Sequence, residues 1–364
     1  MRIGVAYLGR RGPGGPISFQ LAQHLSKKAD IFCVISENAD GLREWNDSGL
    51  ALITTPTFRS KAEAFATYVG SAKAQQLARA IRERNPDVML YPMVHPWTPR
   101  LQHLLAPIPD VVVVHDPIPH PGFIHSLSSL WERRSARNAT RCVVLGRIFV
   151  EELVKQGVRS DRIDVIPHGI LDQYVDSQKV GQNTGPTTIL FFGRITEYKG
   201  LNVLLDAFRR LVTIRPDVQL QIVGDGSLRP YQYGLENTPN LIIVNRWIDD
   251  SEIATYFNRA SILVVPYTSA SQSGVIATAA AFSMPVVATR VGALPEQIED
   301  RQTGLLIEPG SADQLFAAMN SLLDEPEFAR SLGHNLQKRT SKTANWDDIA
   351  TMFKETCRKA VTSG

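Results

Sequence analysis

Two cations on one short segment, Arg194 and Lys199, have the residue types and the spacing needed to bind a diphosphate. They follow an apolar run, Thr188–Phe192, that is typical of a buried strand, and Gly193 lets the chain turn at its end. A helix is expected from near Gly200, because large apolar residues recur on one face after it. The carboxyl end of a parallel strand lies where open α/β sheets bind ligands, and both cations pair well with phosphate. The alternative interpretation is a solvated arginine and lysine on a surface loop.

A glycine-rich loop, residues 9–16, lies between the first expected strand and a helix. Gly14 and Gly15 would let a ligand approach backbone N–H groups at the helix N-terminus, where the partial charge is positive. Pro16 suits the first helical turn. The spacing departs from G-x-G-x-x-G, which argues against a nicotinamide site. We expect ligand contact here, and a flexible loop is the alternative.

His115 follows the apolar run Val111–Val114 directly, so we expect it at the carboxyl end of a strand, projecting toward a ligand. Asp116 or a nearby carbonyl could fix its tautomer, and the prolines of this loop would stiffen it. A purely structural histidine is the alternative. We interpret His168 as hinge packing. Among the other histidines of this half, His120 and His125 are weaker candidates, and His95 and His103 have no assigned role.

Two further loops in the second half carry small polar residues after expected strands. Gly224, Asp225 and Gly226 end an apolar run and could contact a nucleotide through backbone groups. The segment 267–276 combines small hydroxyl residues with glycine at the start of a helix, a pattern that suits an anion or sugar hydroxyls. Its candidate ligand-binding residues are Ser271, Gln272, Ser273, Gly274 and Val275. Serine-rich and glycine-rich turns without a ligand are the alternative for both loops.

Metal ligation is poorly supported by the sequence, which has no D-x-D, no H-E-x-x-H and no carboxylate cluster in the candidate loops. We therefore predict no metal and no cofactor. Arg194, Lys199 and helix N-termini would then have to neutralise a bound diphosphate.

The elements that must position these residues form two successive series of strands and amphipathic helices, which predict parallel sheets covered on both faces. In the first half we expect strands at 2–8, 30–35, 50–54, 87–92, 111–114, 141–145 and 163–166, with helices at 17–26, 61–84, 126–137 and 148–156. In the second half we expect strands at 188–192, 218–223, 241–244, 262–265 and 286–288, with helices at 201–214, 251–259, 275–283, 313–323 and 327–338.

The pattern lapses at residues 181–186, which are typical of a linker. The sequence thus predicts an α/β chain of two doubly wound, Rossmann-like domains, residues 1–170 and 186–344, facing a central cleft. A last helix at about 346–360 has no strand after it. We expect residues 345–364 to cross back and pack on the first domain.

Composition agrees with a chain of two globular domains, since 364 residues exceed one ordinary core and 43% of them are hydrophobic. The three cysteines, Cys33, Cys142 and Cys357, are far apart, which argues against a disulfide framework or zinc site and favours a reducing compartment. The chain opens on an expected strand, so we expect no signal peptide. No apolar run approaches the ~20 residues that span a bilayer.

Charge is unevenly distributed: residues 1–170 hold 21 Lys and Arg against 15 Asp and Glu, and the remainder is net acidic. A basic first half could face an anionic lipid surface or a phosphorylated acceptor. A solvated surface is the alternative. We expect a cytoplasmic protein, with peripheral contact at the inner face of the membrane as the further option, and no nucleic-acid partner.

Taken together, these motifs give the chain a resemblance to the GT-B-fold retaining glycosyltransferases of family four, the "glycosyl transferases group 1" type. The resemblance runs nearly end to end, and the order and spacing of its parts are specific. Beyond the loops described above, it rests on 166–169, 285–289, 291–296, 303–306 and Trp346. It implies transfer of a sugar from a nucleotide diphosphate sugar, with retention at the anomeric carbon.

By position, the resemblance implies that Arg194 and Lys199 hold the diphosphate leaving group while Gly14 and Gly15 approach the phosphates. His115 would contact the donor sugar near the reacting carbon. Arg246, Trp247 and Ile248 fall where the family's backbone reads the base. The catalytic residues would then be His115, Arg194 and Lys199.

The chain departs from the family at one point. The family usually has two glutamates, eight positions apart, before the Pro285–Val286 strand, and these positions hold Ala270 and Thr278. Ser271, Gln272 and Ser273, with the N–H groups of Gly274 and Val275, would then have to meet the sugar and phosphate. Thr278 would stand at the ribose position.

The function predicted from the sequence is therefore a metal-independent retaining glycosyltransferase acting on a carbohydrate, lipid-linked or small-molecule acceptor. Acceptor contacts are expected in the first domain, at 43–61, 92–100 and 117–127. A non-catalytic GT-B partner or sugar-binding subunit is the first alternative, favoured by the missing glutamates. A GT-B epimerase for UDP-N-acetylhexosamine is the second, but it needs several acid–base carboxylates that these loops lack.

Overall fold

The computed structural model describes residues 1–12, 14–58, 72–118, 123–175 and 186–363, with 123–128 described for the backbone alone. The chain divides into two compact units, Met1–Gly169 with Ala344–Gly364, and Ile170–Thr343. The second unit begins at Ile170 rather than at 186, because the short turn η2 (Asp172–Tyr174) contacts helices of that unit. Of the expected linker, residues 181–185 lie outside the described residues.

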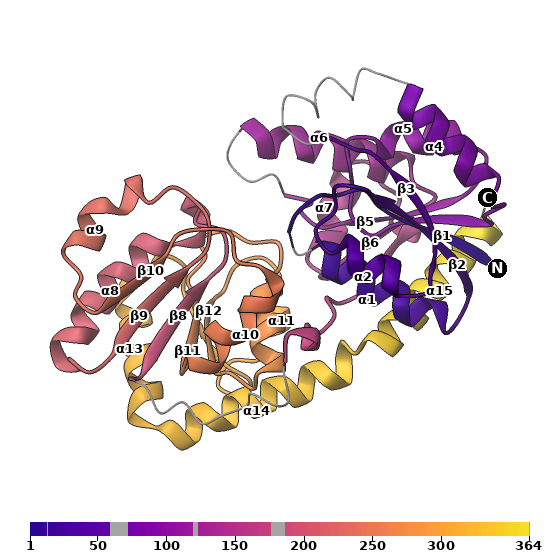
Figure 1. The fold of residues 1–364 in the computed structure, drawn as a ribbon. Coiled ribbons are helices and arrows are strands. Elements are labelled where there is room, and N and C mark those ends of the chain that lie inside the picture. The colour runs from indigo at the N-terminus through magenta and orange to yellow at the C-terminus, as the bar shows by residue number, and fades with distance from the viewer. Residues whose placement is uncertain (13, 59–71, 119–122, 176–185, 364) are drawn as a thin grey trace. The chain divides into compact units, whose positions relative to one another are not determined.

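The first unit is built on a seven-stranded parallel sheet in the order β3-β2-β1-β4-β5-β6-β7 (Figure 1). Its strands are β1 Arg2–Tyr7, β2 Asp30–Ser36, β3 Ala51–Thr55, β4 Val88–Tyr91, β5 Asp110–Val114, β6 Arg141–Val144 and β7 Ile163–Val165. All of β4, β5 and β6 is buried, as expected for strands covered on both faces. The order reverses between β1 and β4, which is the point where sheets of this kind bind ligands.

The helices of the first unit are α1 Gly14–Ser26, α2 Leu42–Asp47, α4 Ala72–Arg82, α5 Thr98–Leu105, α6 Phe123–Asn138, α7 Phe149–Lys155 and α15 Trp346–Ser363. Of the helix expected over 61–84, only the part from Ala72 is described, and it ends at Arg82. The short helices α2 and α5 were not among the sequence predictions.

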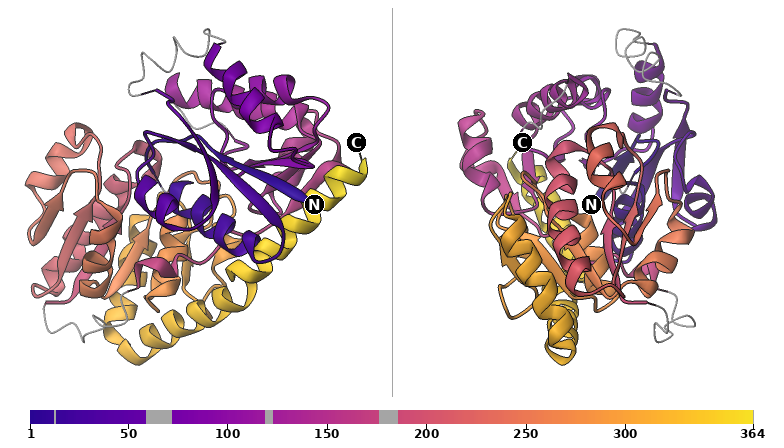
Figure 2. Two further views of the ribbon diagram at one scale, coloured as in Figure 1. Left: turned by 45° about the vertical axis from the view of Figure 1, so that its right-hand side comes forward. Right: turned by 90° about the vertical axis from the view of Figure 1, so that its left-hand side faces the viewer.

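The C-terminal helix α15 belongs to the first unit, as predicted. It packs along α1 and contacts β4 and β5, and Figures 1 and 2 show it running beside that part of the chain. Trp346 explains Gly169, because a Cβ at Gly169 would lie 2.5 Å from the tryptophan ring. Near the C-terminal end of α15, Lys359 forms a 2.9 Å ion pair with Asp164.

The second unit has a six-stranded parallel sheet in the order β10-β9-β8-β11-β12-β13 (Figure 1). Its strands are β8 Thr188–Phe192, β9 Gln219–Val223, β10 Leu241–Val244, β11 Ile262–Val265, β12 Val286–Thr289 and β13 Leu305–Ile307. Its helices are α8 Leu201–Ile214, α9 Gln232–Glu236, α10 Asp250–Arg259, α11 Gly274–Ala281, α12 Leu294–Gln297, α13 Ala312–Asp324 and α14 Pro326–Thr343.

Alternation along β8 explains how this sheet is covered on both faces. Ile189 and Phe191 join the core formed with α8 and α13. Phe192, the next residue, points the other way and packs against Phe257 of α10, with ring centres 5.2 Å apart. Helices therefore cover both faces of the sheet, and loops follow the carboxyl ends of its strands.

No helix among the residues described is both long enough and apolar enough to cross a bilayer.

Candidate functional site

The candidate loops of the second unit all leave the carboxyl ends of neighbouring strands, and backbone hydrogen bonds join them. The Gly193 N–H donates to the Val223 carbonyl at 2.9 Å, and the Ile195 N–H donates to the Asp225 carbonyl at 2.8 Å. The Gly224 N–H continues the series to Val244 at 3.0 Å. Backbone hydrogen bonds therefore join the loops after β8, β9 and β10 along one edge of the sheet.

Gly224 and Gly226 allow the first two of these loops to touch. Gly224 has a φ of +145°, and a Cβ there would lie 1.9 Å from the Gly193 carbonyl oxygen. A Cβ at Gly226 would lie 2.2 Å from the Ile195 carbonyl oxygen. Close packing of two loops thus accounts for both glycines, and a nucleotide contact through their backbone stays a prediction. Asp225, between them, has an exposed side chain.

Replacing Gly224 by alanine is expected to lower the free energy of unfolding by about 2–3 kcal/mol, since the added methyl group meets a fixed carbonyl. Gly310→Ala is the matched control, because Gly310 also has a positive φ, +77°, but has nothing within 4 Å of its Cβ position. The control is expected to lose only about 1 kcal/mol. Equal losses in denaturant unfolding would contradict this explanation.

Lys199 is held on the face of an aromatic ring. Its Nζ lies 3.6 Å from the centre of the Tyr267 ring and 5.2 Å from that of Tyr198. The loop is attached to the β11 loop, because the Thr268 N–H donates to the Tyr198 carbonyl at 2.8 Å. Gly200 permits this approach: its φ is +70°, and a Cβ would lie 1.9 Å from the Pro266 carbonyl oxygen.

Arg194 stands on the same loop with an exposed side chain, and it takes part in none of the ion pairs found within the described ranges. Burial raises the pKa of Tyr267, beneath Lys199, to about 12, so this phenol stays neutral. The loop therefore presents one cation to solvent and one packed on a neutral ring, five positions apart.

The loop before α11 is held in place by hydrogen bonds from Gln297 and Ala293. Both backbone groups of Ser273 bond to the Gln297 side chain. The Ser273 N–H donates to it at 2.9 Å, and the Ser273 carbonyl accepts from it at 3.1 Å. The Ala293 N–H donates to the Ser271 carbonyl at 3.0 Å. Ser273 stands at the N-cap of α11, yet its side chain does not cap the helix. The first turn of the helix is thus left without a side-chain acceptor.

Ser271 Oγ and Gln272 Oε1 of this loop are among the buried polar atoms that meet no hydrogen-bond partner within the described residues. Ser271 is 3% exposed. A buried polar atom without a partner is costly, so its retention next to a helix N-terminus favours a polar ligand there. Gly274 and Val275, which begin α11, are half-buried.

The two positions that depart from the family pattern carry no charge in the folded chain either. Ala270 is buried, and a Cβ at the neighbouring Gly292 would lie 1.7 Å from its carbonyl oxygen. The Thr278 hydroxyl is buried and donates to the Gly274 carbonyl, one turn earlier in α11, at 3.1 Å. That bond uses the hydroxyl proton within the helix. The predicted contact of Thr278 with a ribose therefore stays a prediction.

The segment expected to read a base, residues 246–248, is built around an ion pair. Arg246 binds Glu252 with both terminal nitrogens, at 2.6 and 2.8 Å. This pairing lowers the pKa of Glu252 to about 2. Trp247 is 40% exposed, and Ile248 is buried. The arginine side chain is thus paired with α10, and base reading by the backbone of this segment stays a prediction.

In the first unit, Gly14 and Gly15 begin α1, and both are buried. A Cβ at Gly14 would lie 2.8 Å from the Met93 side chain, which gives this glycine a packing reason. A Cβ at Gly15 would lie 3.4 Å from the Tyr7 hydroxyl, an ordinary contact distance. The predicted approach of both glycines to phosphates stays a prediction.

His115 has a defined tautomer. Its Nε2 lies 2.8 Å from the Pro92 carbonyl oxygen, which can only accept, so Nε2 carries the proton. Burial lowers the pKa of His115, and the neutral ring then has a lone pair on Nδ1. The Pro92 carbonyl, rather than Asp116, thus fixes the tautomer.

Sequence reasoning missed Glu132, on α6. Its carboxyl group accepts hydrogen bonds from the backbone N–H groups of His115 and Asp116. Burial, with Asp116 nearby, raises the pKa of Glu132 to about 8. Gln297 was missed as well, although it directly follows the 291–296 stretch on which the resemblance rests. The sequence shows only that Glu132 and Gln297 are polar. Their partners lie on other elements of the fold, so no local pattern marks them.

The other histidines have structural surroundings. His168 Nδ1 lies 2.8 Å from the Gly169 carbonyl oxygen, and burial lowers its pKa to about 4. His95 is buried, stacks on Phe58 and accepts from the Trp97 N–H at 3.2 Å, with its pKa lowered to about 3. His103 is exposed. His120 and the side chain of His125 lie outside the described residues.

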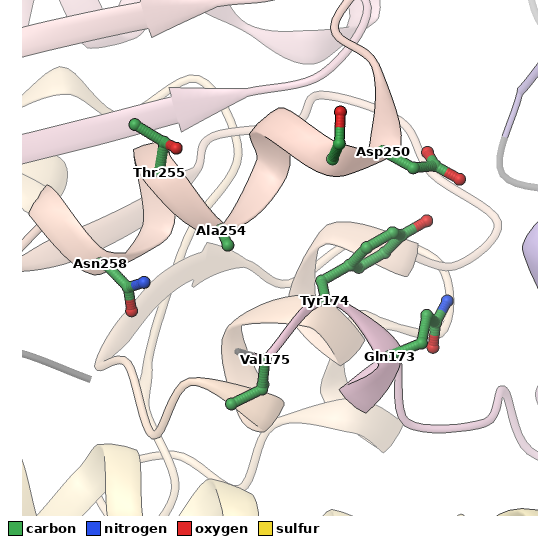
Figure 3. A pocket seen from close by; sticks show the side chains of 8 residues that line it. Gln173, Tyr174, Val175, Asp250, Ala254, Thr255 and Asn258 are labelled. Atoms are coloured by element: carbon green, nitrogen blue, oxygen red, sulfur yellow. The ribbon is translucent and has the colours of Figure 1, made fainter. Parts of the chain in front are cut away.

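Within the part of the chain that the structure describes, no group of three or more His, Cys, Asp or Glu residues is placed to hold a metal ion. A pocket of about 230 Å³ lies between η2 and α10 (Figure 3). Figure 3 shows Tyr174 beside Asp250 there, and burial with that carboxylate raises the tyrosine's pKa. The pocket is lined by none of the predicted site residues.

Comparison with known proteins matches both halves of the chain. Residues 186–325 match the family described as "Glycosyl transferases group 1", and residues 17–173 match "Glycosyltransferase Family 4". A D-inositol 3-phosphate glycosyltransferase of Paenarthrobacter aurescens is 29% identical over 285 residues, 74% of this chain and 67% of that protein. A glycogen synthase of Mycobacterium tuberculosis is 25% identical over 74% of this chain and 68% of its own length. The chain thus spans about two thirds of these curated relatives.

Solved structures show the same fold at low identity. Anabaena HepE, in complex with UDP and glucose, has a TM-score of 0.77 and 15% identity, covering 99% of this chain and all of that one. A sucrose-phosphate synthase from Thermosynechococcus elongatus also has a TM-score of 0.77, with 19% identity and complete coverage of both chains.

Proposed function

We propose, on the premise that this chain belongs to the glycosyl transferases group 1 and is a glycosyltransferase of the GT-B fold, that it moves a sugar from a nucleotide diphosphate sugar to an acceptor hydroxyl with retention. The observation that carries the proposal is the Arg194–Lys199 loop, bonded to the β11 loop whose buried Ser271 hydroxyl lacks a partner. These loops place two cations and a helix N-terminus on one edge of one sheet.

Leaving-group stabilisation is the proposed mechanism. Charge develops on the diphosphate as the bond to the sugar breaks, and Arg194 and Lys199 would neutralise it. The N-terminus of α11 would add its partial positive charge, with Ser271 Oγ as a hydrogen-bond donor. These groups support a reaction that needs no divalent ion. The acceptor hydroxyl would attack from the face that the diphosphate leaves and would pass its proton to the departing phosphate oxygen, without a protein nucleophile.

The first unit is proposed to act on the donor sugar through His115. Its neutral ring can accept a hydrogen bond from a sugar hydroxyl at Nδ1, since Nε2 donates to Pro92. Gly14 and Gly15 are proposed to approach the phosphates at the N-terminus of α1. Because Ala270 and Thr278 replace the two usual glutamates, Ser271, Gln272 and Ser273 are proposed to meet the sugar and phosphate instead.

The acceptor is proposed to be a carbohydrate or a lipid-linked hydroxyl compound, bound by the first unit. The named relatives act on an inositol phosphate and on glycogen, which supports a polyhydroxylated acceptor. Of the three expected stretches, 92–100 is fully described, whereas 59–61 and 119–122 lie outside the described residues. Peripheral membrane contact is part of the same proposal only for a lipid-linked acceptor.

A thermal-shift panel of UDP, GDP and ADP sugars tests this function. The matching donor at about one hundred times its Kd is expected to stabilise the protein by about 2.7 kcal/mol, and the corresponding nucleoside monophosphate by much less. Stabilisation by the monophosphate alone would contradict a site organised around the diphosphate. No response to any nucleotide would favour a non-catalytic partner subunit, the reading that the two missing glutamates suggest.

A further inference from the structure

Glu132 is a partly buried carboxyl group of the first unit that the proposed mechanism does not use. It lies in the middle of α6, half-buried, and that helix packs against β5. Its carboxyl group accepts from the backbone N–H groups of His115 and Asp116, the two residues that directly follow β5. One side chain thus fixes both peptides of the turn that carries a predicted catalytic residue.

The His115 ring is anchored separately from its backbone. Nε2 donates to the Pro92 carbonyl at 2.8 Å, while the peptide N–H donates to Glu132. With both ends fixed, the direction of the Nδ1 lone pair is set. A change at either anchor would turn the ring without removing it.

We propose that Glu132 is a positioning residue, whose carboxyl group holds the His115–Asp116 turn so that His115 Nδ1 is presented to the donor sugar. This inference rests on the proposed function, since it assumes that His115 contacts the donor. In this proposal Glu132 acts through His115 and not by contact with a substrate.

The proton on Glu132 gives the proposal a pH signature. Burial and the Asp116 charge raise the pKa of Glu132 to about 8, so the group is a neutral acid at pH 7. The titratable groups of α5, which also packs on α6, are Arg100 and His103. Above pH 8 a second carboxylate would form beside Asp116, and repulsion would distort the turn.

Substitutions at Glu132 test the positioning role through activity. Glu132→Ala leaves two backbone donors unpaired and is expected to lower kcat/KM for the donor by about 10- to 100-fold, with the acceptor KM unchanged. Glu132→Gln keeps an acceptor oxygen and cannot ionise, so at pH 7 it is expected to stay within about twofold of wild type. It is also expected to remove the fall in kcat/KM that the wild type shows above pH 8. Glu83→Gln, an exposed glutamate on the same unit, is the control with an unchanged profile.

Thermal unfolding without substrate tests the protonated carboxyl independently of catalysis. Between about pH 4.5 and 8 the folded protein keeps a proton that the unfolded chain has released, so wild-type stability falls as pH rises through this window. The Tm of Glu132→Gln, relative to wild type, is therefore expected to rise from pH 5 to pH 8. Glu83→Gln is expected to keep a constant difference.

Three results would overturn the proposal: a folded Glu132→Ala with wild-type kcat/KM, a Glu132→Gln as impaired as Glu132→Ala at pH 7, or an alkaline fall in activity that persists in Glu132→Gln. If wild type instead transfers no sugar from any donor, the proposed function fails. The pH series of unfolding then still decides whether Glu132 holds its proton under the His115 turn.

Discussion

Arg194→Ala is expected to lower kcat by about 10²–10³-fold, because one charge-stabilising contact on a leaving group is worth about 3–4 kcal/mol in the transition state. The fold is expected to remain intact, because the side chain is exposed and takes part in none of the ion pairs found among the described residues. Steady-state transfer with the donor found by the thermal-shift panel measures the effect, and circular dichroism with Tm checks the fold.

Arg330→Ala is the matched control for that variant. Arg330 is exposed on α14 and pairs only one turn away with Glu327, a surface contact expected to contribute little. It removes the same charge from the same unit at a position outside the site loops. Wild-type turnover in purified, folded Arg194→Ala would remove the basis of the leaving-group mechanism.

Lys199→Met is expected to lower kcat by about 10²-fold while keeping the apolar stem of the side chain on Tyr267. Loss of the cation–π contact is expected to cost about 0.5–1 kcal/mol of unfolding free energy, so stability and rate should separate clearly. Transfer kinetics and denaturant unfolding of the same preparation measure both quantities.

Lys338→Met, at an exposed position of α14, controls for the loss of one positive charge from the second unit. A Lys199→Met variant that loses stability as expected but keeps wild-type kcat would assign this lysine to packing on Tyr267. The diphosphate would then have to be neutralised by Arg194 and the helix N-terminus alone.

The strands were predictable from sequence because each central strand is a short, continuous apolar run between loops. The sequence prediction for Thr188–Phe192 is confirmed residue by residue, and that for Val111–Val114 is one residue shorter than β5. The four-residue α12 was missed, because a helix of this length does not complete a recognisable period, and the three-residue β13 was missed as well. The return of α15 was predicted from its position after the last strand.

The chemistry of the loops was only partly predictable. Arg194, Lys199 and His115 are identifiable because His115 follows β5 directly and the two cations lie on the loop after β8, which fixes the edge of the sheet on which each lies. Gly224 was interpreted as a nucleotide contact, yet its backbone approach to Gly193 requires glycine without any ligand. Glu132 looks like an ordinary solvated glutamate within a helix, and only the packing of α6 on β5 gives it partners.

Titration calorimetry of the matching nucleoside diphosphate, in excess EDTA, tests most directly whether two protein cations neutralise the leaving group. The wild type is expected to bind with the same Kd as in the presence of Mg²⁺, and the Arg194→Ala/Lys199→Met double variant is expected to bind about 100-fold more weakly or not at all. A wild type that binds only with added metal, or a folded double variant with wild-type Kd, would contradict the account.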